Sequence, residues 1–80
     1  MRVPIIAGNW KMNKTPSEAR TLAMAMKDRL QAITGVERVL CPPFIDIPTV
    51  AEVIAGTDIG LGAQNLYPEN SGAYTGEISP

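Results

Sequence analysis

Short apolar runs alternate along this chain with segments that carry helix signals. Residues 3–7 are apolar at every position, and residues 36–41 and 59–65 form two further runs that are largely apolar. A run without polar alternation is typical of a parallel strand that is buried on both faces. We therefore expect strands over these three ranges, connected through helices into a parallel sheet.

The first intervening segment opens with the sequence TPSE, which is a strong helix start. Thr15 can cap the helix, Pro16 suits its first turn and Glu18 completes a capping box. Apolar residues then recur at steps of three and four: Ala19, Leu22, Ala23, Met26, Leu30 and Ile33. The pattern predicts an amphipathic helix that runs to about Thr34 and stops at Gly35.

Weaker signals mark the rest of the chain. Asp46 as a cap, Pro48 in the first turn and Gly56 at the end predict a second helix over residues 46–55. Residues 66–79 show no periodicity and predict a loop, and loops of this length are usually functional in a compact domain. Three strands and two helices leave sheet edges unpaired, so we expect this chain to be part of a larger domain.

Composition narrows the class of protein. Eighty residues make one small domain at most, and a net charge of −1 argues against nucleic acid or an anionic membrane surface as a partner. The single cysteine, Cys41, fits a reducing compartment, and no apolar stretch approaches the ~20 residues that cross a bilayer. We therefore expect a cytoplasmic protein. The absence of histidine removes the commonest acid–base residue and metal ligand.

Polar residues follow two of the expected strands. The sequence GNWKMN comes directly after the first strand, and Gln64 lies at the end of the third. GNWKMN is either an ordinary connecting loop or the rim of a site into which Asn9 and Lys11 point. Taken singly, a lysine in such a loop is usually solvated and an asparagine is usually a turn former.

Four motifs in register carry a family resemblance: AGNWKMN after the first strand, CPPF after the second, GAQN on the third and GAYTGEIS in the long loop. Together they resemble the triosephosphate isomerase family. The resemblance implies an α/β fold, the eight-stranded (β/α)8 barrel, of which this chain corresponds to the first three strands. Residues 1–80 would then be the N-terminal part of a single barrel domain.

The resemblance also implies an activity. Such an isomerase interconverts dihydroxyacetone phosphate and glyceraldehyde 3-phosphate in glycolysis and gluconeogenesis, as a homodimer and without a metal or organic cofactor. The family is itself a common example of tuned acid–base chemistry, with a glutamate base and a neutral histidine electrophile. Both lie on later strands of the family, so we expect the eighty residues alone to be inactive.

Residue roles carry over by the same resemblance. Lys11 is the expected catalytic cation, which also attracts the anionic substrate, and Asn9 is a polar contact to a substrate oxygen. Gln64 is expected to hold these two residues in place.

The remaining matched residues belong to the expected dimer interface. Thr75 would support Asn9 of the other subunit, Met12 would dock beneath the partner's long loop, and Glu77 would be a structural ion-pair partner in that loop.

Two other interpretations remain open from the sequence. The chain could be a non-enzymatic barrel fragment that self-associates or complements another fragment through its open strand edges. It could also be a small complete α/β protein that binds phosphate, although the Ser79-Pro80 pair, which resembles a further helix start, argues against this.

Overall fold

The computed structural model describes residues 2–80. Strands and helices alternate in the expected order, with one short 3-10 helix before the second α-helix. The elements are β1 (Ile5–Asn9), α1 (Pro16–Gln31), β2 (Glu37–Cys41), η1 (Phe44–Asp46), α2 (Ile47–Ile54) and β3 (Gly60–Leu61). No helix in the described part of the chain is long and apolar enough to cross a membrane.

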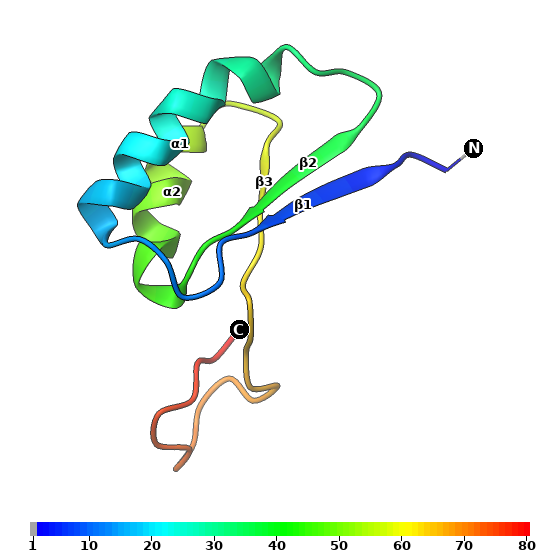
Figure 1. Ribbon diagram of the computed structural model, residues 1–80. Coiled ribbons are helices and arrows are strands. Elements are labelled where there is room, and N and C mark those ends of the chain that lie inside the picture. Colours follow the sequence, from blue (N-terminus) through cyan, green and yellow to red (C-terminus); the bar gives the residue numbers. More distant parts are fainter. Residues whose placement is uncertain (1) are drawn as a thin grey trace.

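The three strands form one parallel sheet in the order β1-β2-β3, which confirms the expected topology (Figure 1). Asn9 at the end of β1 is level with Cys41 at the end of β2, and Leu40 pairs with Leu61 of β3. The carboxyl ends of the three strands therefore lie at the same edge of the sheet.

The start of α1 is the capping box that the sequence predicts. The Thr15 hydroxyl accepts the Glu18 backbone N–H at 3.4 Å, and the Glu18 carboxylate accepts the Thr15 backbone N–H at 2.9 Å. This backbone hydrogen bond is the main cause of a lowered pKa for Glu18. The helix ends at Gln31, before the expected end near residue 34, because the Ile33 N–H bonds to the Leu30 carbonyl and tightens the last turn.

The second helix forms close to the expected range, with Pro48 in its first turn and a left-handed Gly56 after its end. Asp46 is the N-cap residue of this helix, as expected, but its side chain makes no capping hydrogen bond. η1 leads into Asp46 with helical backbone angles, so its carboxylate turns into the protein and is fully buried.

Three strand expectations are also wrong. β1 is Ile5–Asn9 instead of residues 3–7, and β3 is only Gly60–Leu61 instead of residues 59–65. Burial on both faces fails for β1, where Ile5 and Ile6 are 63% and 65% exposed. The reason is that both helices lie on one side of the sheet and pack over β2 and β3, whereas β1 is at the edge (Figure 1).

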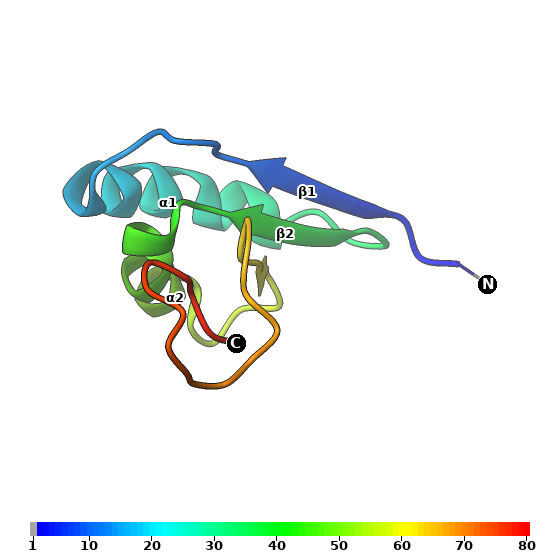
Figure 2. The same ribbon diagram turned by 90° about the horizontal axis from the view of Figure 1, so that it is seen from below.

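The core lies between the two helices and that face of the sheet. Small residues of α1 allow α2 to approach closely, and the remaining core residues are branched and apolar. The buried members are Ala19, Ala23, Leu40, Val50, Val53, Ile54 and Ile59. The chain after β3 leaves the sheet and curls back outside this core (Figure 2).

Candidate functional site

The carboxyl edge of the sheet brings together three of the residues that the sequence singles out. Asn9 ends β1, Lys11 follows it by two positions, and Gln64 comes shortly after β3. In open parallel sheets and barrels, ligands bind at this edge because the loops there are free to carry polar side chains.

Lys11 has an uncommon backbone conformation that its neighbours hold in place. Its φ is 56°, in the left-handed region that a lysine rarely adopts. The Lys11 N–H donates to Asn9 Oδ1 at 2.9 Å, and its carbonyl accepts from Gln64 Nε2 at 2.9 Å. Both backbone groups of the strained residue are therefore bonded to side chains of the other two candidates.

Gln64 also fixes the end of the middle strand. Its Nε2 donates a second hydrogen bond, to the Cys41 carbonyl at 2.8 Å, and the same carbonyl accepts the Trp10 N–H at 3.1 Å. One side-chain amide thus connects the loop after β1 with the end of β2. This arrangement restrains the loop that carries Lys11 from two sides.

The side chains at this edge are open to solvent. Asn9, Lys11 and Gln64 are all exposed. Because Gln64 Nε2 already donates to two backbone carbonyls, the donors left for a ligand are the Lys11 ammonium and the side-chain N–H groups of Asn9. An ammonium and an amide N–H are suited to binding an oxygen on which negative charge develops. Within residues 2–80, no three His, Cys, Asp or Glu side chains gather as a metal site.

Of the predicted interface residues, Thr75 and Glu77 lie apart from this cluster, whereas Met12 borders it. Met12 is next to Lys11 and is 95% exposed. Thr75 and Glu77 are exposed residues of the long loop, which Figures 1 and 2 show outside the sheet. Glu77 makes no ion pair within the described residues, and its N–H donates to the Tyr74 carbonyl at 3.0 Å.

The long loop has internal structure although it contains no helix or strand. The Tyr67 N–H donates to the Ile78 carbonyl at 2.7 Å, which closes the loop at its base. The Tyr67 and Tyr74 rings pack with centroids 4.4 Å apart. A Cβ on Gly72 would lie 2.5 Å from the Tyr74 ring, so only glycine fits beneath it. The loop is thereby shaped by its own contacts.

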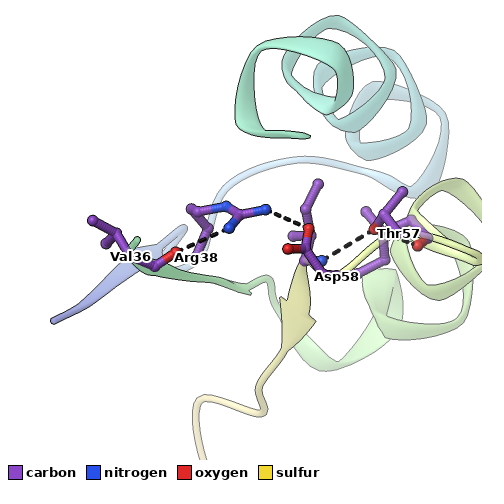
Figure 3. A network of polar contacts seen from close by, with 6 residues as sticks. Val36, Arg38, Thr57 and Asp58 are labelled. Carbon is purple, nitrogen blue, oxygen red and sulfur yellow. Dashed lines mark hydrogen bonds and ion pairs between the residues drawn. The ribbon is translucent and has the colours of Figure 1, made fainter. Parts of the chain in front are cut away.

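A second polar network lies at the opposite ends of the strands (Figure 3). The buried Arg38 guanidinium pairs with Asp58 and donates to the Val36 carbonyl at 2.9 Å. These residues border a cavity of about 520 Å³. That cavity lies at the amino ends of the strands. In such folds the residues at this end usually stabilise the structure, whereas ligands bind at the carboxyl ends, so we do not assign the site there.

Two contributors to the carboxyl edge are missed by the sequence interpretation. One is the Cys41 carbonyl, which cannot be recognised from sequence because every residue has one. The other is Gly62, whose position level with Cys41 could have been found by counting along the paired strands.

Comparisons with known proteins agree on one family. A family profile described as "Triosephosphate isomerase" matches residues 4–80. A protein named triosephosphate isomerase from Dehalococcoides mccartyi strain 195 is 58% identical over 80 residues, which are 100% of this chain and 32% of that protein. One from Chloroflexus aurantiacus is 52% identical over the same shares of the two chains.

A solved structure gives the same answer for the fold. The crystal structure of triosephosphate isomerase from Bartonella henselae superimposes with a TM-score of 0.84 at 34% identity, over 96% of this chain and 31% of that chain. The chain thus spans about a third of the length of the curated relatives it matches.

Proposed function

The chain belongs to the triosephosphate isomerase family, and we propose that it contributes the first part of an isomerase site for triose phosphates. The observation that carries the proposal is the strained Lys11 backbone, held between Asn9 and Gln64 at the carboxyl edge of the sheet. Strain of this kind costs about 1–3 kcal/mol and is retained mainly where function needs it.

The chemistry gives each residue a role. Moving a proton between adjacent carbons of dihydroxyacetone phosphate and glyceraldehyde 3-phosphate passes through an enediolate, so negative charge develops on substrate oxygens. The Lys11 ammonium stabilises this charge more than it stabilises the neutral carbonyl, which lowers the barrier. Asn9 contacts a substrate oxygen, and Gln64 holds the loop that carries Lys11.

The reaction also needs groups that residues 1–80 do not supply. The base and the electrophile, a glutamate and a histidine in the family, come from later strands of the complete barrel. Residues 1–80 form the N-terminal part of that single domain and are inactive alone. No metal or organic cofactor takes part, and the enzyme works in the cytoplasm in glycolysis and gluconeogenesis.

The active protein is a homodimer in this proposal. Thr75 of the long loop supports Asn9 of the partner subunit, and Met12 lies beneath the partner's loop. The 95% exposure of Met12 and the internally braced loop support this arrangement, since both leave side chains available to a second copy.

A second candidate function rests on the exposed edge of β1. Ile5 and Ile6 are exposed, and the edge has no strand partner within residues 2–80. Such an edge favours self-association or complementation of another barrel piece without catalysis. Sedimentation of residues 1–80 separates this candidate, because a compact monomer with no tendency to associate argues against it.

Substitution of Lys11 tests the enzymatic proposal. In a full-length chimera, residues 1–80 replace the matching segment of the Dehalococcoides mccartyi relative. Lys11→Met removes the ammonium and keeps an unbranched side chain of similar length. We expect kcat/KM for isomerisation to fall by at least about 100-fold.

Lys14→Met is the matched control, because Lys14 is also exposed and left-handed, with φ of 87°. It should leave kcat/KM close to that of the unsubstituted chimera. Equal losses for the two variants would contradict the assignment of Lys11, since they would reflect only the loop conformation.

A further inference from the structure

A glycine faces a thiol at the carboxyl edge of the sheet. Cys41 lies in the middle strand, level with Asn9 of β1. On its other side, Gly62 follows Leu61, and the Gly62 N–H donates to the Leu40 carbonyl at 2.8 Å, which continues the pairing beyond β3. Cys41 therefore stands between Asn9 and Gly62, and paired residues of a parallel sheet point to the same face.

The thiol occupies the space where a side chain at position 62 would begin. A Cβ placed on Gly62 would lie 2.9 Å from Cys41 Sγ, which is closer than real contacts allow. Gly62 is not in the left-handed region, so its absent side chain, and not its backbone freedom, is what matters here.

The backbone around Cys41 has little freedom to relieve such a contact. The Cys41 carbonyl accepts hydrogen bonds from Trp10 and Gln64, and β1 flanks the strand on the other side. A larger residue at position 62 must therefore displace the thiol by rotation about its Cα–Cβ bond. The space on the far side of Cys41 is next to Asn9.

We propose that Gly62 is a positioning residue of the site: it keeps the Cys41 thiol on the β3 side and leaves the space beside Asn9 free. The inference rests on the proposed function of Asn9 as a substrate contact. Because Asn9 Oδ1 also accepts the Lys11 N–H, a thiol that displaces Asn9 disturbs the Lys11 loop as well. Gly62 thus acts on both residues without touching substrate.

Substitutions at positions 62 and 41 of the full-length chimera test the proposal. Gly62→Ala should lower kcat/KM by about tenfold, mainly through kcat, because Asn9 contacts an oxygen that gains charge in the transition state. Cys41→Val keeps Gly62 but adds a second branch at the Cβ, and it should have a similar effect. The double variant Gly62→Ala/Cys41→Ala should recover most of the loss.

Gly60→Ala is the matched control. Its Cβ would lie 3.3 Å from Val39 Cγ2, so it introduces crowding on the same face of β3, one step farther from the site. If replacing a glycine only disturbs packing, Gly60→Ala and Gly62→Ala should both lower the stability of the chimera and leave kcat unchanged. We expect only Gly62→Ala to change kcat.

The side-chain amide resonances of Asn9 provide a readout that does not depend on catalysis. They should shift in Gly62→Ala and Cys41→Val and return in the double variant. If they do not shift, or if the double variant fails to restore them, the positioning role is wrong. An unsubstituted chimera without isomerase activity would instead overturn the proposed function, while these resonances would still decide the role of Gly62.

Discussion

Lys11 and Lys14 both have left-handed backbones, but hydrogen bonds from other candidate residues hold only Lys11. The sequence motif is sufficient to identify Asn9 and Lys11 as candidates. It is not sufficient to find the Cys41 carbonyl, whose two donors depend on how three strands align. Side chains of a site can be identified from the sequence, whereas the backbone groups that accept hydrogen bonds there can be identified only from the three-dimensional structure.

Asp46 offers a prediction about stability. Its carboxylate is fully buried and neither oxygen has a hydrogen-bond partner within the described residues. The position near the start of α2 gives a favourable dipole interaction of at most about 2 kcal/mol, which is less than the several kcal/mol that burying an ion costs. Asp46→Asn removes the ionisable group but leaves a buried amide without partners, so it should raise the free energy of unfolding of residues 1–80 by only about 1 kcal/mol.

Urea titration followed by circular dichroism measures this change. Asp28→Asn serves as the control because Asp28 is exposed on α1, and its effect should stay within about 0.5 kcal/mol. A loss of stability in Asp46→Asn would mean that the carboxylate makes a favourable interaction, contrary to this view of its environment.

Helices and strands differ in how well the sequence predicts them. The start of α1 depends on residues three apart in the chain, so Thr15 and Glu18 were enough to predict it. The limits of a strand depend on its partners. β1 continues to Asn9 because Cys41 lies opposite, and β3 is limited to Gly60 and Leu61 by its pairing with Val39 and Leu40 of β2. Neither fact is local in the sequence.

The capping box predicts a pH dependence for α1. Hydrogen bonds from the Thr15 backbone and side chain lower the pKa of Glu18 in the folded chain below its unfolded value. The contribution of Glu18 is therefore present above the unfolded pKa and is lost as the pH falls through the folded pKa. Helix content of residues 1–80, measured by circular dichroism, should decrease between about pH 5 and pH 2.

Glu18→Gln separates this effect from general acid unfolding. The glutamine amide oxygen can still accept the Thr15 N–H but does not titrate, so the decrease in helix content over that range should be smaller. An unchanged acid titration in the variant would show that other carboxylates dominate.

In the molecule as a whole, the predicted site residues and the predicted interface residues of the long loop lie in two separate places. Asn9, Lys11 and Gln64 meet at the carboxyl edge of the sheet, while Thr75 and Glu77 lie in a braced loop outside it. The sequence predicted both groups from family motifs. The exposed apolar residues of β1 were not predicted, because continuous apolar runs indicate burial and do not show which neighbours are present in eighty residues.

Turnover of triose phosphate by residues 1–80, compared with the full-length chimera, tests most directly whether this chain is one part of an isomerase site. The chimera should be active, and the isolated chain should show no activity above its own Lys11→Met variant, because the base and electrophile lie elsewhere. Isomerase activity of the isolated chain that depends on Lys11, or a folded chimera without activity, would contradict the assignment.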